Sequence, residues 1–168
     1  MNEPIQQASK RSEESMPSTV SVRLIDYDSE EYRRSLNLRD EVLRRPLGHS
    51  LFDDDLSGDV SAIHIAAFAQ ERIVGILLLC SKGEHVLQMR QVAVDESLRG
   101  MQIGRKMVEY AEEVAIRQQT QELILHAREV AVLFYEKLGY TREGERFEEV
   151  GIPHYTMRKK LTSSTAKR

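Results

Sequence analysis

The chain has 168 residues, of which 40% are hydrophobic and 30% are charged. This length and composition are typical of one globular domain with a buried core. The formal net charge of −3 provides no overall positive field, so we expect no general binding to nucleic acid or to an anionic membrane. A single cysteine, Cys80, predicts no intramolecular disulfide and no cysteine-based zinc site, and it favours the cytoplasm.

The two ends of the chain differ in composition from its middle. Residues 1–19 are polar, with no apolar core, so we expect a disordered tail and no signal peptide. Residues 162–168 read as a second tail. The longest apolar run, Ile73 to Cys80, is too short to span a membrane. One domain is therefore expected at residues 20–161.

The first half of this domain predicts a strand, a helix and a meander. Residues 20–25 alternate as a strand, and Asp28 or Ser29 can cap a helix that runs to about Arg45 and is stopped by Pro46 and Gly48. A polar loop follows. Three strands with short connections then predict an antiparallel meander, at residues 62–69, 73–80 and 86–94. The second of these is apolar throughout, as expected of a central strand covered on both faces.

The second half predicts two helices among three further strands. A helix is expected at about 102–119, a buried strand at 122–127 and a short helix at 129–138 closed by Gly139. Residues 140–161 have room for two more strands, broken by Gly151 and Pro153. The expected order is β-α-β-β-β-α-β-α-β-β, an α/β fold with a mixed sheet and helices on its faces.

The turn after the strand that ends at Val94 predicts an anion site. It carries Arg99, and Arg105 and Lys106 follow in the first turn of the next helix. Cations are unfavourable at the positive end of a helix, and an anion bound by the free amides removes the conflict. Glycines at 100 and 104 allow a close approach of the backbone. Neither the Walker nor the Rossmann glycine pattern is present, which disfavours a nucleotide hydrolase or a dehydrogenase.

Two segments resemble motifs of the GNAT acetyltransferase superfamily. Residues 99–104 resemble motif A, Arg/Gln-x-x-Gly-x-Gly/Ala, although Gln102 stands where glycine is usual. Residues 131–140, AVLFYEKLGY, look like motif B, A-x-x-F-Y-E-K-x-G-F/Y. The ending at 149–154 resembles that of a bacterial subgroup. The resemblance covers about 20–161 and implies the GNAT-type acyl-CoA N-acyltransferase fold in a single-domain bacterial form.

This resemblance implies an N-acetyltransferase that moves the acetyl group of acetyl-CoA to a primary amine by direct ternary-complex transfer. The acceptor is then a small-molecule or peptide amine. The resemblance also implies that the pantetheine arm pairs with a strand end and that the pyrophosphate sits on the following loop. The implied cofactor-binding residues are Val92, Ala93, Val94, Arg99, Gly100, Met101, Gln102, Ile103, Gly104 and Arg105.

The same resemblance implies catalytic candidates. Tyr135 matches the usual general acid, which protonates the departing thiolate. His126, near the end of a strand, is a candidate general base, but other residues stay open for that role, as does a chain of waters: Glu41, Glu148, Glu149 and His154. Arg90 or Arg128 can bind a substrate carboxylate in bidentate fashion, or can simply form a rim ion pair.

Two other functions remain open at this point. The chain can be a non-catalytic CoA-binding or sensing module, or a protein-interaction domain whose basic turn meets an acidic partner. A homodimer through the C-terminal strands is possible, because family members often form one. The histidines and the lone cysteine lack the spacing of metal ligands, so we expect no metal site.

Overall fold

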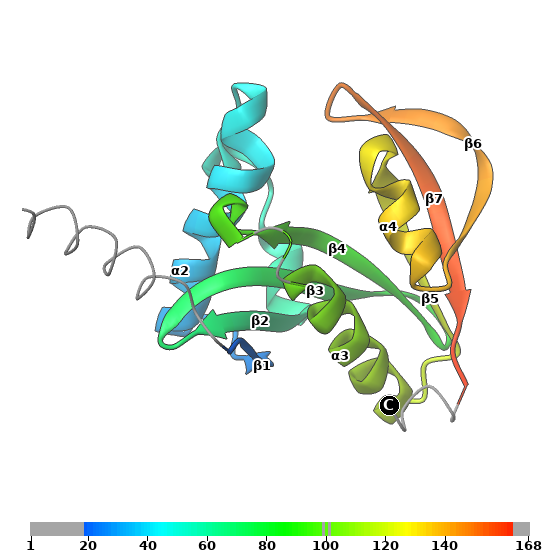
Figure 1. Ribbon diagram of the computed structural model, residues 1–168, viewed down its shortest axis with the longest axis horizontal. Coiled ribbons are helices and arrows are strands. Elements are labelled where there is room, and N and C mark those ends of the chain that lie inside the picture. The colour runs from blue at the N-terminus through cyan, green and yellow to red at the C-terminus, as the bar shows by residue number, and fades with distance from the viewer. Residues whose placement is uncertain (1–18, 99, 101, 163–168) are drawn as a thin grey trace, which may run out of the picture.

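The computed structural model describes residues 19–98, 100 and 102–162, so both expected tails lie almost wholly outside the described residues. It contains a mixed seven-stranded sheet with the order β1-β2-β3-β4-β5-β7-β6 (Figure 1). The strands are β1 (Ser21–Ile25), β2 (Ile63–Ala69), β3 (Arg72–Gly83), β4 (Val86–Val94), β5 (Glu122–Arg128), β6 (Thr141–Glu149) and β7 (Ile152–Lys160). The expected α/β fold and element order are confirmed.

Three α-helices accompany this sheet in the described residues: α2 (Glu30–Arg39), α3 (Ile103–Arg117) and α4 (Val132–Lys137). The Ser29 hydroxyl accepts a hydrogen bond from the backbone N–H of Tyr32 at 3.1 Å and so caps α2, as predicted. The helical path then continues to Leu47 as a π-helical turn and a 3₁₀ turn. Gly48 ends it with a φ of 75°, which a glycine adopts without steric cost.

Helices cover both faces of the sheet, and β3 is buried between them. Leu77 belongs to a core that includes residues of α3, whereas Leu78 belongs to a second core formed with α2. In Figure 1, α3 lies in front of the sheet and α2 behind it, while α4 lies beside β5 and β7. The prediction of a central strand covered on both faces is confirmed, since its apolar side chains alternate between the two cores.

The C-terminal hairpin corrects one sequence expectation. The turn between β6 and β7 lies at Val150 and Gly151, as predicted for Gly151. The expected second break at Pro153 is wrong, because Pro153 lies inside β7 opposite Glu148. The pairing of β7 with β5 begins only at His154, so no β5 residue stands opposite the proline. Proline is tolerated at such an edge position because no ladder hydrogen bond is lost there.

The parallel strands β4 and β5 separate partway along the sheet. They pair only from Val86 opposite Glu122 to Met89 opposite Leu125. Beyond that point β4 stays with β3 and β5 stays with β7, and Figure 1 shows the two strands diverging. A β-bulge lies just after the last pair, where Gln91 has a φ of 56°. Bulges bend and twist a strand, which moves β4 away from its neighbour.

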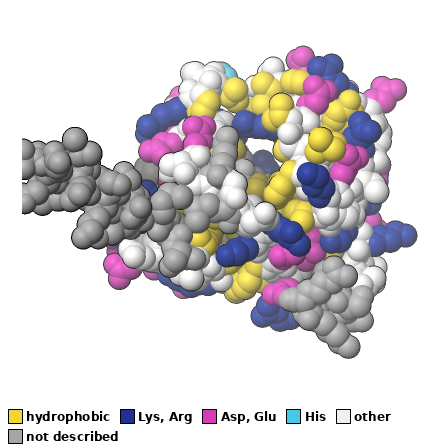
Figure 2. Space-filling view, viewed as in Figure 1, with side chains coloured by type: hydrophobic (Ala, Val, Ile, Leu, Met, Phe, Trp, Pro, Cys, Tyr) yellow, Lys and Arg dark blue, Asp and Glu magenta, His cyan; other side chains and the backbone are white. Residues whose placement is uncertain are grey.

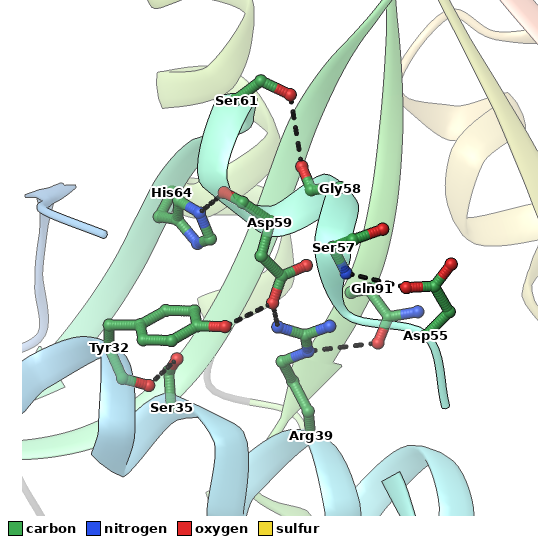
Figure 3. A network of polar contacts seen from close by, with 10 residues as sticks. All are labelled: Tyr32, Ser35, Arg39, Asp55, Ser57, Gly58, Asp59, Ser61, His64 and Gln91. Carbon is green, nitrogen blue, oxygen red and sulfur yellow. Dashed lines mark hydrogen bonds and ion pairs between the residues drawn. The ribbon is translucent and has the colours of Figure 1, made fainter. Parts of the chain in front are cut away.

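A buried polar network connects α2 to this bulge (Figure 3). One carboxylate oxygen of Asp59 accepts hydrogen bonds from the Tyr32 hydroxyl at 2.6 Å and from Arg39 at 2.8 Å. The Nε of Arg39 donates to the side-chain oxygen of Gln91 at 3.1 Å. The His64 Nε2 faces the backbone oxygen of Asp59 at 2.8 Å. The guanidinium therefore holds the bulge residue against α2.

The Arg39–Asp59 ion pair predicts a large loss of stability when one partner is removed. Both side chains are almost fully buried, at 2% and 8% exposure. In Asp59→Ala the guanidinium stays buried without its counter-charge, so we expect the free energy of unfolding to fall by about 3–5 kcal/mol. Urea denaturation measures it. Glu109→Ala, which removes the exposed partner of Arg105, is the matched control and should cost below about 1 kcal/mol. Equal losses would contradict this account.

Candidate active site

A cavity of about 490 Å³ opens where β4 and β5 separate. Its walls come from β4 at residues 88–92 and from β5 at 125–128, together with parts of the segment after α2, of β3, of α4 and of the β6–β7 hairpin. The space-filling view shows the surface hollowed between the two sides of the molecule, with Lys or Arg atoms visible inside (Figure 2). The separation of the strands thus leaves room for a ligand inside the sheet layer.

One wall of this cavity carries a histidine–carboxylate pair. The Nδ1 of His126 lies 3.0 Å from Oε1 of Glu149, a hydrogen bond between β5 and the end of β6. A carboxylate accepts only, so Nδ1 carries the hydrogen and the neutral ring keeps its lone pair on Nε2. The ring of Phe147 packs edge-on against His126, with the centroids 5.1 Å apart. The imidazole is therefore oriented, and its Nε2 can accept a proton.

A second histidine lies behind this pair. His154 is only 4% exposed, and its Nδ1 is 2.9 Å from the backbone oxygen of Ile152. Its Nε2 lies 3.7 Å from the other oxygen of Glu149, which is longer than a hydrogen bond. Phe147 stacks on His154. His154 therefore supports the wall, while His126, at 30% side-chain exposure, is the more accessible of the two.

Tyr135 reaches the same cavity from α4. Its side chain is 6% exposed and packs against the rings of Phe134 and Tyr140. Burial raises the pKa of the Tyr135 hydroxyl well above its usual value, because the phenolate would be poorly solvated. Among the described residues this hydroxyl has no hydrogen-bond partner, yet the residue lines the cavity. The arrangement supplies a protonated donor at the inner wall.

Beyond Met89, the edge of β4 that no longer pairs with β5 supplies backbone groups. Ala93 is buried in the core on the α2 side, while Val92 and Val94 pack against the core on the α3 side. These residues pair with β3 on one edge only, since β4 has no β5 partner after Met89. An unpaired strand edge can hydrogen-bond an extended ligand.

The start of α3 has the features of an anion site. Gln102 occupies the N-cap position with a φ of 64°, and it makes no side-chain hydrogen bond to the helix. The first turn of α3 carries no acidic residue, and Gly100 has a φ of 92°. The first amides of the helix are therefore left without a side-chain cap. Arg99 and Met101, both expected to bind cofactor, lie outside the described residues.

Two positions at the start of α3, residues 102 and 104, have geometry that favours glycine. A left-handed backbone, as at Gln102, suits glycine and costs other residues about 1–2 kcal/mol. Gly104 packs closely, because a Cβ atom there would lie 3.2 Å from the ring of Phe134 and the ring would have to shift. Ile103 is buried in the core on the α3 side, and Arg105 forms an exposed ion pair with Glu109 at 3.4 Å. Ile103 and Gly104 therefore anchor the helix start.

The structure brings together only some of the predicted base candidates. His126, Glu149 and His154 line the cavity, whereas Glu41 and Glu148 do not. The polar loop after the first helix contains three aspartates at 53–55, and two of them bind nearby groups. Asp54 pairs with Arg44 at 2.9 Å, and Asp55 accepts a hydrogen bond from the amide of Ser57. Four polar wall residues were not predicted from the sequence: Arg44, Lys82, Gln88 and Gln91. Gln88 and Gln91 stand with Arg90 in a strand that is otherwise apolar, and these polar interruptions were the available signal.

In the described part of the chain, none of the helices is long and apolar enough to cross a membrane. No three of its His, Cys, Asp or Glu side chains form a cluster that could hold a metal ion.

Solved structures with the same fold include proteins described as N-acetyltransferases. A protein of Lactobacillus plantarum, provisionally described as an N-acetyltransferase, has a TM-score of 0.78 at 22% identity, over 86% of this chain and all of that one. An aminoglycoside 6′-N-acetyltransferase in complex with coenzyme A has a TM-score of 0.67 at 19% identity, over 84% of this chain and 97% of that one. At these identities the likeness defines the fold class alone.

The sequence comparisons identify the family. Residues 40–161 match the model of the acetyltransferase (GNAT) domain. A Bacillus subtilis (strain 168) protein, provisionally named as an acetyltransferase, is 34% identical over 111 residues, which make up 66% of this chain and 74% of that protein. The chain belongs to the GNAT family of acetyl-CoA-dependent acetyltransferases.

The left-handed backbone at the N-cap predicts that glycine is more stabilising than alanine at residue 102. In an exposed helical position alanine is more stabilising than glycine by about 1 kcal/mol. At a φ of 64° the order should reverse, so Gln102→Gly should unfold at a higher urea concentration than Gln102→Ala. The free energies of unfolding of the two variants should differ by about 1 kcal/mol. Both variants remove the same exposed side chain, which makes each the control for the other. An equal or more stable alanine variant would show that the left-handed geometry is wrong.

Proposed function

We propose that the chain transfers the acetyl group of acetyl-CoA to a primary amine within a ternary complex. The observation that carries this proposal is the cavity between the separated strands, whose walls hold both His126 and Tyr135. These groups supply a proton acceptor and a proton donor to one space, as acyl transfer to an amine requires. A covalent acetyl-enzyme has no support, because burial raises the pKa of the Cys80 thiol and so disfavours the thiolate.

The base in this proposal is His126, with Glu149 as its positioning residue. The amine nitrogen attacks the thioester carbonyl carbon and forms the new C–N bond. Nε2 of His126 takes the proton that the nitrogen must lose, and the hydrogen bond from Nδ1 to Glu149 stabilises the imidazolium that results. The negative charge on the carbonyl oxygen of the tetrahedral intermediate is stabilised by backbone N–H groups of the unpaired β4 edge.

The acid in this proposal is Tyr135. When the tetrahedral intermediate collapses, the C–S bond breaks and the electron pair stays on sulfur. The Tyr135 hydroxyl gives its proton to that thiolate and is then reprotonated from solvent. Burial raises the pKa of Tyr135, so the hydroxyl carries its proton at neutral pH and is available as a donor to the departing sulfur.

The donor site in this proposal uses backbone groups. The uncapped amides at the start of α3 would hold the pyrophosphate of acetyl-CoA, and the β4 edge would pair with the pantetheine arm. This fits the residues present, because the first turn of α3 carries no acidic side chain to repel phosphate. The thioester would then lie between β4 and β5, within reach of the cavity walls.

Tyr135→Phe should separate binding from chemistry. Because the hydroxyl makes no hydrogen bond to the described residues, the phenylalanine should fit the same space. We expect acetyl-CoA to raise the midpoint of thermal unfolding equally in both proteins, by several degrees at a hundred times Kd. CoA release with an amine should fall roughly 100-fold in kcat. In the parent protein, activity should not drop as the pH rises from 7 to 10, because burial keeps Tyr135 protonated there.

Three outcomes would count against parts of this proposal. Full CoA release by Tyr135→Phe would remove the acid role. Binding of acetyl-CoA without CoA release from any amine by the parent protein would favour a CoA-binding module. No response to acetyl-CoA at all would favour an interaction domain.

A double-mutant cycle tests the histidine–carboxylate pair. His126→Ala should lower kcat/KM roughly 100-fold, and Glu149→Gln about 10-fold, because the amide cannot stabilise the imidazolium. If Glu149 acts through His126, the double variant should be no slower than His126→Ala alone. Steady-state CoA release measures all three. Independent, multiplicative losses would contradict a positioning role for Glu149.

A further inference from the structure

The walls of the cavity carry an excess of positive charge. Among the described lining residues, four side chains are cationic and one is a carboxylate, that of Glu149. The cations come from separate segments of the chain, Arg44 after α2, Lys82 on β3, Arg90 on β4 and Arg128 on β5. This is notable in a chain whose formal net charge is −3. The excess is therefore a local property of this cavity.

The carboxylates near the cavity offset only part of this charge. Glu149 already accepts the hydrogen bond from His126, and Asp54 pairs with Arg44 at 2.9 Å. Neither Arg90 nor Lys82 has a carboxylate oxygen within 4.0 Å in the described part of the chain. The Arg90 side chain contacts the thiol of Cys80, and burial raises the pKa of that thiol. A ligand can therefore meet cations here that no described acid occupies.

The sheet directs the two strand arginines to the same side as the candidate base. Met89 and Leu125 form the last pair between β4 and β5, and both point into the core on the α3 side. Successive side chains of a strand alternate, so the residues that follow, Arg90 and His126, point to the opposite face. Arg128, two residues after His126, shares that face. A molecule held between the arginines therefore lies next to His126.

We infer that the acceptor is a small primary amine that also carries a carboxylate or phosphate group. The inference rests on the proposed transferase function. Arg90 and Arg128 would bind the anionic group, and the guanidinium fork fits both of these anions in bidentate fashion. The amine at the other end of the molecule would then approach Nε2 of His126.

The same charges argue against a polycationic acceptor. A polyamine or an aminoglycoside would bring several positive groups to walls that already hold four cations, with Glu149 as the one carboxylate among the described lining residues. Like-charge contacts of this kind are unfavourable. The aminoglycoside acetyltransferase that shares this fold at 19% identity therefore does not predict the acceptor here.

Matched pairs of amines test this inference directly. The probes are β-alanine against its carboxamide and phosphoethanolamine against ethanolamine, followed by CoA release at a fixed acetyl-CoA concentration. We expect kcat/KM for the anionic member of each pair to be higher by at least about 10-fold. Arg90→Gln should lower kcat/KM by roughly 10- to 100-fold for the two amines that carry an anionic group. It should leave kcat/KM unchanged for the two amines that lack one, here called the neutral members. Comparing variant with parent for each amine cancels differences in intrinsic reactivity.

The controls separate the outcomes. Arg117→Gln removes the same charge from the end of α3, away from the cavity, and should leave all four rates unchanged. Arg90→Glu should reverse the preference within each pair. Equal losses for anionic and neutral amines in Arg90→Gln, or equal rates for both in the parent protein, would overturn the inference while the transferase proposal stands. No CoA release with any amine, although acetyl-CoA binds, would overturn the transferase proposal and the inference with it.

Discussion

The candidate active site adjoins a mismatch in length between the neighbouring strands β3 and β4. Leu78 of β3 lies opposite Arg90 of β4, and Ile76 lies opposite Ala93. One residue separates the two positions on β3, whereas two residues separate them on β4. The extra residue is accommodated at Gln91, where φ is positive. A bulge increases the twist of its strand, and β4 leaves β5 directly before this point. The cavity and the free strand edge both lie beyond this bulge, where the strands are apart.

Two buried polar networks hold the separated strands in place. On the β4 side, Arg39 links Asp59 of one segment to Gln91 at the bulge. On the β5 side, Glu112 of α3 accepts hydrogen bonds from Tyr140 at 2.9 Å and from Lys159 of β7 at 3.0 Å. Burial and this carboxylate raise the pKa of Tyr140, so its hydroxyl stays a donor. Each side of the separation is therefore braced by its own network.

The sequence predicted the features that depend on residues close together along the chain. Helical spacing, alternation and glycine positions gave nearly every element, and the motif around Tyr135 led to the family. The residues it missed depend on contacts across the sheet. Nothing near Gln91 in the chain indicates that Arg39, 52 residues away, binds it, and Arg44 reaches the cavity from a segment whose own pattern shows only a helix end. Glu149 was one of several candidate bases, and its hydrogen bond to His126 became visible only when β6 and β5 were placed together.

The chemistry of the cavity is divided between backbone and side chains. In the proposed function acetyl-CoA would meet mainly backbone groups, at the start of α3 and along the β4 edge, and these depend on conformation rather than on side-chain identity. The acceptor would meet side chains such as His126 and Arg90, which stand on separate strands and can change one at a time without altering the path of the main chain. A fold built in this way keeps its donor while its acceptor changes, which is why likeness of fold alone cannot name the acceptor. The charges on the cavity walls are therefore the stronger guide to what this chain acetylates.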